Sequence, residues 1–183
     1  MVTNSKGFTL LELIIIIAIL GISMAIAAPG LSTMIANNRI SSSASDFASA
    51  LQLAKAEAVA RLNPVIVCKK NAASNGCIAD GDWSQGWIVF SDDNGNGGAD
   101  LGSGESILLV HEALEANITF VGSDGVDSSI TFRPSGTNSI TSTESLVISD
   151  QRGLDNCATR TILVTITGRG SVMKPRDTGQ EGC

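Results

Sequence analysis

Apolar residues dominate the first part of the chain. Over residues 8–28 most side chains are apolar, and Glu12 carries the only charge. At about 1.5 Å per residue, a helix of this length just covers the hydrocarbon core of a bilayer, which is roughly 30 Å thick. The pattern therefore predicts a membrane-spanning helix that follows a short polar leader, residues 1–7.

Beyond Pro29 the helical period continues, but only one face stays apolar. Apolar residues recur there at steps of three and four, which is typical of a helix that buries one side. This stripe consists of Ile40, Ala44, Phe47, Leu51, Ala54, Ala58 and Leu62. Asn63 and Pro64 end the pattern, because Pro cannot continue the hydrogen bonding of a helix. We expect one long helix over residues 8–62, bent near Pro29, whose second half packs on a globular domain.

The residues after the helix are rich in short β-branched and aromatic runs, separated by Gly, Asn, Asp and Ser. The expected strands are residues 65–68, 86–90, 106–110, 118–121, 129–132, 145–148 and 161–167. They suggest one antiparallel sheet with a hairpin or two, covered by the apolar stripe of the helix. The pattern predicts an α+β chain of four parts: the leader 1–7, a membrane-spanning helix 8–29, an amphipathic half-helix 30–63 and a β-domain 64–183.

The apolar segment is open to three interpretations: a secretory signal peptide, a plain membrane anchor, or a signal that is cut before the apolar run. A secretory signal would be cleaved after the run, where Pro29 makes a poor site. A plain anchor has no use for Glu12, whose carboxylate costs up to about 2.5–3.5 kcal/mol deep in a bilayer. A free amine, created by cleavage just ahead of Glu12, would give this carboxylate a partner.

Residues 6–13, which read Lys-Gly-Phe-Thr-Leu-Leu-Glu-Leu, resemble the class III signal of type IV pilins and type II secretion pseudopilins. The resemblance implies that prepilin peptidase cuts between Gly7 and Phe8, that the new amino terminus is methylated, and that the apolar helix remains as the assembly surface. It also implies that Glu12 pairs with the terminal amine of a neighbouring subunit. The alternative is a protonated or snorkelling Glu12 near the membrane edge.

A second pattern lies in the β-rich part of the chain. Residues 83–90 contain a Trp-x-x-Gly-Trp element, and residues 91–100 follow it as an Asp/Asn/Gly-rich turn. With residues 54–59 of the helix, Ala-Lys-Ala-Glu-Ala-Val, this pattern is similar to the GspH/FimT/FimU group of minor pilins. The resemblance spans most of the chain and implies the pilin fold, a long N-terminal helix packed on an antiparallel β-sheet domain.

The same resemblance implies a structural subunit of a type IV pilus that helps to initiate or cap assembly, or alternatively a type II secretion pseudopilin. Its partners would be other pilins and minor pilins, through the N-terminal helix, together with prepilin peptidase and the inner membrane. It would be a single-pass inner-membrane protein with its β-domain in the periplasm, and later part of the pilus at the cell surface. No catalytic motif is present, and the single histidine, His111, stands at the end of an expected strand.

Four cysteines in an exported chain indicate an oxidising compartment and a disulfide framework. Three pairings are possible, of which Cys68 with Cys77 and Cys157 with Cys183 are the local ones. A metal site of four thiolates is disfavoured, because the chain has no Cys-x-x-Cys pair and the spacing is irregular.

The Asp/Asn/Gly-rich turn raises a calcium alternative. Asp92, Asn94, Asn96 and Asp100 stand where an EF-hand loop places four of its ligands, but Ser103 occupies the position of the bidentate Glu. A tight hairpin tip of turn-forming residues explains the composition better, and no cofactor is expected.

Double-stranded DNA is an alternative partner. Some FimT-like minor pilins are associated with DNA capture in natural transformation through a C-terminal Gly-Arg-x-Arg turn, whereas residues 168–171 read Gly-Arg-Gly-Ser. The net charge of −6 opposes phosphate binding at long range, although residues 151–183 carry a local excess of cations. The candidate DNA-binding residues are Arg160, Arg169, Lys174 and Arg176.

Overall fold

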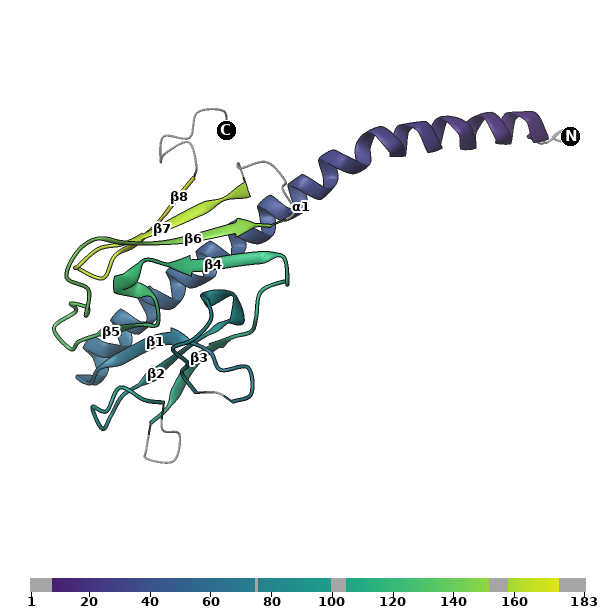
Figure 1. The fold of residues 1–183 in the computed structure, drawn as a ribbon. Coiled ribbons are helices and arrows are strands. Elements are labelled where there is room, and N and C mark those ends of the chain that lie inside the picture. Colours follow the sequence, from purple (N-terminus) through teal and green to yellow (C-terminus); the bar gives the residue numbers. More distant parts are fainter. Residues whose placement is uncertain (1–7, 75, 100–104, 152–157, 175–183) are drawn as a thin grey trace, which may run out of the picture. The chain divides into compact units, whose positions relative to one another are not determined.

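The computed structural model of the chain describes residues 8–74, 76–99, 105–151 and 158–174. Its first element is the helix α1 (Leu10–Arg61). The chain divides into two units, Met1–Ile35 and Ala36–Cys183, so that α1 contributes its first half to one unit and its second half to the other. All the strands belong to the second unit (Figure 1).

The first half of α1 begins at a well-defined cap. The Thr9 hydroxyl accepts a hydrogen bond from the backbone N–H of Glu12 (3.2 Å), and the Thr9 carbonyl accepts one from Leu13 (3.2 Å). Thr followed three residues later by Glu is the pattern of a capping box, which fixes where a helix starts.

By length and composition, no single helix among the described residues is a membrane-spanning candidate, whereas Leu10–Ile26 and Gly30–Arg61, taken together as a bent pair, qualify.

The second half of α1 buries the predicted apolar stripe. The stripe residues from Ile40 to Ala58 are fully buried, which confirms the helical periodicity. Leu62 does not follow, because the helix ends at Arg61. Leu62 takes a left-handed backbone conformation with φ of 58° and leaves its side chain 73% exposed. The backbone conformation that ends the helix thus turns the last residue of the stripe to solvent.

Among its described residues, the second unit contains eight strands and two short 3-10 helices. They are β1 (Val65–Lys69), η1 (Trp83–Gln85), β2 (Trp87–Ser91), β3 (Ile107–His111), β4 (Ile118–Gly122), η2 (Asp124–Val126), β5 (Ser129–Phe132), β6 (Glu144–Asp150), β7 (Arg160–Val164) and β8 (Gly170–Met173). All seven predicted strands are present, to within three residues at either end. The strand β8 was not predicted.

The strands form two antiparallel sheets of four strands each, in the orders β3-β2-β1-β5 and β4-β6-β7-β8. The expectation of one sheet with a hairpin or two was therefore wrong, because the pairing of strands depends on long-range packing and not on the local pattern. The predicted class, a long N-terminal helix packed on an antiparallel β-domain, is confirmed.

The main core lies between the second half of α1 and both sheets. Phe47 of α1 stands at its centre, with edge-to-face contacts to Trp83 (ring centroids 5.0 Å apart), Trp87 (5.1 Å) and Phe120 (4.9 Å). A smaller cluster on the other face of β1 and β2 includes Phe90. These two strands are thus buried on both faces, which explains why their sequences are continuous apolar runs.

Candidate functional site

The Trp-x-x-Gly-Trp element places both of its Trp side chains in the core. The Trp83 indole N–H donates to the carbonyl of Val126 (2.9 Å). Between the two Trp residues, Gly86 has φ of 95°, and a Cβ atom there would lie 2.3 Å from the carbonyl oxygen of His111. Only glycine fits this position. The element that carried the resemblance therefore has a packing role, because it allows Trp83 and Trp87 to meet Phe47.

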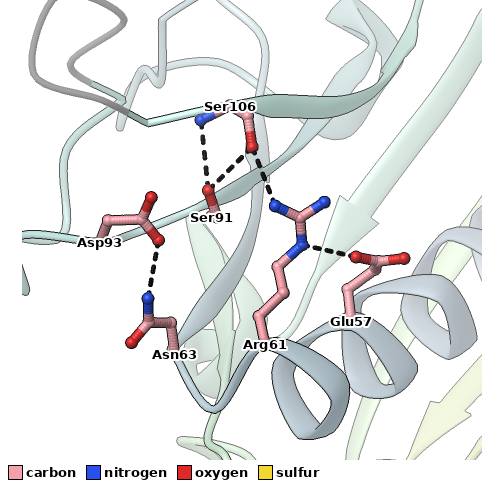
Figure 2. A network of polar contacts seen from close by, with 6 residues as sticks. All are labelled: Glu57, Arg61, Asn63, Ser91, Asp93 and Ser106. Atoms are coloured by element: carbon pink, nitrogen blue, oxygen red, sulfur yellow. Dashed lines mark hydrogen bonds and ion pairs between the residues drawn. The ribbon is translucent and has the colours of Figure 1, made fainter.

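A network of polar contacts fastens the end of α1 to the β2–β3 hairpin. Arg61 donates from Nε to Glu57 (2.6 Å) and from Nη1 to the hydroxyl of Ser106 (3.3 Å). The Asn63 amide donates to the carboxylate of Asp93 (3.0 Å). Figure 2 shows the complete network, Glu57, Arg61, Asn63, Ser91, Asp93 and Ser106. The end of the helix is thus held by directional contacts in addition to the core.

The processing and assembly residues lie around the start of α1. Gly7 is outside the described residues, Phe8 is exposed, and Glu12 lies in the exposed first turn of the helix. The Glu12 carboxylate makes no hydrogen bond or ion pair with any residue that the structure describes. It is therefore accessible to a partner from another molecule.

One of the two local disulfides is present. Cys68, on β1, is bonded to Cys77. Backbone hydrogen bonding supports the same loop, since Ile78 donates to the carbonyl of Lys69 (3.1 Å). Cys157 and Cys183 lie outside the described residues. The disulfide fixes a surface loop to the buried face of β1, where the smaller core cluster lies.

Sequence reasoning missed a buried lysine beside this disulfide. Lys69 is fully buried, and its Nζ donates to the carbonyls of Ala79 (2.6 Å) and Gly81 (2.9 Å). The carboxylate of Asp127 lies 3.7 Å from the same nitrogen. The two carbonyls and the carboxylate compensate the buried charge of Lys69. In turn, the hydrogen bonds from Lys69 hold the loop after Cys77 in place. The only sequence signal was the position of Lys69 at the end of a buried strand.

The Asp/Asn/Gly-rich turn uses its side-chain oxygens within the loop itself. The buried Asp92 carboxylate accepts hydrogen bonds from the backbone N–H groups of Gly95 (2.9 Å) and Gly97 (3.1 Å), and Asn94 accepts one from Asn96 (2.9 Å). Asp100 is outside the described residues. In the described parts of the chain no group of three or more His, Cys, Asp or Glu side chains is arranged for a metal ion. The hydrogen bonds to Asp92 and Asn94 close tight turns within residues 92–97.

His111 is held against the core. Its ring stacks on Trp87, with centroids 3.8 Å apart and planes 9° from parallel. Its Nδ1 lies 2.8 Å from the carbonyl oxygen of Glu112, and its Nε2 lies 3.8 Å from Asp46 on α1. The histidine thus connects the end of β3 with the helix, which is a structural role.

The candidate DNA-binding residues lie at opposite ends of the β7–β8 hairpin. Arg160 begins β7 and Lys174 follows β8, and the register of these strands places both at one end. Arg169 lies in the turn at the other end, five residues along the hairpin from either of them, or about 17 Å at roughly 3.3 Å per strand residue. Arg176 is outside the described residues. The structure therefore does not gather the described members of this set into one patch.

Arg169 instead shares a groove with a cation from the helix. A cavity of about 660 Å³ lies between the second half of α1 and the turn that connects β7 to β8. Its walls consist of Gln52, Lys55, Ala56, Val59, Thr167, Gly168 and Arg169. Sequence reasoning missed this groove, because its two walls lie more than a hundred residues apart along the chain.

Comparison with known families gives two matches along the chain. The family described as type II transport protein GspH matches residues 43–170, which include most of the second unit. The prokaryotic N-terminal methylation motif matches residues 2–28, around the expected processing site. No curated protein sequence matches the chain.

Two solved structures are similar in fold, both of the type IV minor pilin FimU from Pseudomonas aeruginosa. The crystal structure in space group P21 has 21% sequence identity and a TM-score of 0.55, covering 74% of this chain and 89% of that one. The structure in space group P65 has 22% identity and a TM-score of 0.52, covering 73% of this chain and 91% of that one. At these identities the likeness concerns the fold.

Proposed function

Because the chain belongs to the family of the type II transport protein GspH and carries the N-terminal methylation motif, we propose that it is a minor pilin that helps to initiate or cap a type IV pilus. Minor pilins and pseudopilins are structural subunits and not enzymes. The motif implies processing by prepilin peptidase and assembly with other pilins. The proposed cut lies between Gly7 and Phe8.

The arrangement around Glu12 carries the proposal. Thr9 caps α1, so the helix begins just after the proposed new amino terminus at Phe8. The carboxylate of Glu12 then stands in the first turn without a partner among the described residues. In an apolar layer a carboxylate needs a cation, and the terminal amine of the next subunit is the one that the processing reaction creates. Pairing between subunits would set their stagger in the filament.

The apolar first half of α1 supports the proposed location. Before assembly this segment would anchor the protein in the inner membrane by a single pass, with the β-domain in the periplasm. After assembly the same side chains would contact the helices of other pilins at the cell surface. Both environments favour the exposed apolar residues of this half.

A pseudopilin of a type II secretion system is the second candidate. The description of the matching family favours it, whereas the likeness to FimU favours a pilus. Both candidates use the same helix and the same Glu12. We do not extend the proposal to DNA binding, because Arg169 lies far along the hairpin from Arg160 and Lys174.

The test is complementation of a strain that lacks this gene and makes no pili. We expect Glu12→Ala to give fewer pili than the wild-type gene by at least about tenfold, the factor that 1.4 kcal/mol produces. Glu57→Ala is the matched control, since it removes a carboxylate from the other half of the same helix, where Glu57 pairs with Arg61 on the surface. Protein level and processing are followed by immunoblot.

Wild-type piliation with Glu12→Ala would overturn the role of this carboxylate in assembly. If the strain carries a type II secretion system instead, the same variants are scored by the amount of secreted substrate. A defect in secretion with normal pili would assign the chain to the secretion machine.

A further inference from the structure

The groove beside Arg169 is positively charged, although the protein as a whole is negatively charged. The chain has a net charge of −6, yet the two charged residues that line the groove, Lys55 and Arg169, are both cations. The remaining lining residues are uncharged. The groove is therefore a cationic site on an acidic protein.

The turn that carries Arg169 has a fixed shape. The backbone N–H of Gly168 donates to the carbonyl of Thr165 (2.8 Å), and that of Thr165 donates to the carbonyl of Arg169 (3.1 Å). Gly168 is buried with φ of 76°, and a Cβ atom there would meet the ring of Phe132 at 2.7 Å. The turn is thus seated on the core, and the position of Arg169 is set in advance of any binding.

The two cations of the groove differ in their partners. The Nζ of Lys55 donates to the carbonyl oxygen of Thr167 (2.7 Å), which ties the helix wall to the turn. Arg169 is exposed, and its guanidinium makes no hydrogen bond or ion pair within the described part of the chain. One cation is thus held in place, and the other is open to a ligand that can accept several N–H donors.

Apart from Lys55, the helix wall of the groove consists of exposed, uncharged residues. Gln52, Ala56 and Val59 follow one another along the solvent side of α1. The Gln52 amide offers both a donor and an acceptor to a peptide backbone, and Ala56 and Val59 offer small apolar surface. This combination fits an extended chain that carries both acidic and apolar side chains.

We propose that the groove docks an extended acidic segment of a neighbouring pilin subunit, with carboxylates on Arg169 and Lys55 and an apolar side chain on Ala56 and Val59. The proposal rests on the proposed function as an assembly subunit. Charge complementarity selects an anionic segment, and the small number of cations favours carboxylates over nucleic acid. A DNA backbone needs an array of cations, whereas Arg160 and Lys174 lie at the far end of the hairpin and the chain as a whole has a net charge of −6.

The test is site-specific photo-crosslinking in cells that assemble the full chain. Benzoylphenylalanine replaces Val59 in the groove or, as the matched control, Val121 on β4; the two valines are 47% and 52% exposed. We expect an adduct at the Val59 position whose partner peptide comes from a pilin subunit and contains at least two Asp or Glu residues. The control position should not give this peptide.

A charge reversal then tests the basis of recognition. We expect Arg169→Glu to lower the yield of this adduct by about tenfold, whereas Arg169→Lys keeps most of it. Resistance to protease and the intact Cys68–Cys77 disulfide show that the variant is folded. The proposal would be overturned by an adduct yield that Arg169→Glu leaves unchanged or by a partner peptide without carboxylates. It would equally be overturned by an adduct with DNA or by the absence of any adduct.

This experiment separates the groove from the assembly role. If Glu12→Ala abolishes pili but the Val59 position gives no acidic pilin peptide, the groove proposal fails and the proposed function stands. If Glu12→Ala leaves pili at wild-type levels, the proposed function fails whatever the groove binds.

Discussion

Both halves of α1 are rich in apolar residues, but only the second half buries them within the chain. In the first half Ile17 is 59% exposed, and its apolar neighbours on every side are exposed as well. In the second half Phe47 and Leu51 are fully buried, and mostly polar residues occupy the other face. The same secondary structure thus has two kinds of surface.

The difference follows from how the apolar residues are distributed around the helix. A single stripe can be covered by one domain, which leaves the polar face in water. A helix that is apolar all round cannot be covered in that way and needs an apolar medium or several other helices. The second half therefore belongs to the fold of this chain, whereas the first half is suited to contacts outside it.

Replacing one large apolar residue by Ala in each half of α1 should destabilise the protein to very different extents. We expect Phe47→Ala to lower the free energy of unfolding by about 3–5 kcal/mol, because it empties the centre of the aromatic cluster. Ile17→Ala should change it by less than about 0.5 kcal/mol, since that side chain is exposed. Thermal unfolding of the full chain in detergent, followed by circular dichroism, gives both values. Equal losses would contradict the division.

The second half of α1 needs a stable domain on which to dock, and the disulfide contributes to that stability. Replacing both Cys68 and Cys77 by Ala should lower the free energy of unfolding by about 2.6 kcal/mol, the loop-entropy value for a loop of this length. The measurement is chemical denaturation with the other two cysteines retained. An unchanged midpoint would show that Lys69 and the smaller core cluster fix the loop without the disulfide.

The Trp-x-x-Gly-Trp element can be tested in the same domain with two glycines. Gly86→Ala should be more destabilising than Gly95→Ala by about 1–3 kcal/mol. Both glycines have positive φ, but a Cβ atom at position 86 meets the backbone of His111, whereas at position 95 nothing lies within 4 Å. The fluorescence of Trp83 and Trp87 during urea unfolding measures the difference. Equal effects would remove the packing explanation of the element.

The smallest expected effect concerns the pH dependence of the domain. The hydroxyl of Ser123, and after it that of Ser142, donates to the Glu144 carboxylate and lowers the pKa of this group below its ordinary value of 4.5. A lowered pKa in the folded state contributes stability above the ordinary value, and this contribution is lost as the pH falls through the lowered pKa. Glu144→Gln should therefore show a slightly smaller loss of melting temperature below about pH 4.5 than the wild type. A variant with the same slope would contradict the role of this carboxylate.

Sequence periodicity was sufficient to predict an element where the face that the local pattern marks as apolar is also the face that packs in the core. The spacing of Ile40, Phe47, Leu51 and Ala58 predicted the docked helix, because a period of three to four residues defines one face whatever covers it. It failed at Leu62, whose apolar side chain fits the stripe but whose backbone turns left-handed.

Features that depend on distant partners could not be predicted. The strand β8 contains glycine, serine and an exposed Val172, so it lacks alternation and forms only because β7 pairs with it. The buried Lys69 depends on carbonyls from a later loop. The groove joins Lys55 to a turn far along the chain. In each case the deciding contact is between residues that are separated in sequence.

The N-terminal motif was readable from sequence alone because cleavage and methylation act on a short linear segment. Residues around Gly7, Phe8 and Glu12 match it, as the comparison with the methylation motif shows. The structure adds that Thr9 caps the helix at this point. The motif indicates processing by prepilin peptidase. Whether the mature protein keeps the apolar first half of α1 depends on where the chain is cut.

The intact mass of the protein, purified from cells that contain prepilin peptidase, shows directly whether the chain is cut between Gly7 and Phe8. We expect a chain that begins at Phe8, carries one methyl group on its amino terminus and keeps the apolar half of α1. The same protein from cells without the peptidase should retain residues 1–7. A mature chain that begins after Ala28 would have lost the apolar half as a signal peptide, and one that still begins at Met1 would never have been processed; either mass would rule out prepilin processing.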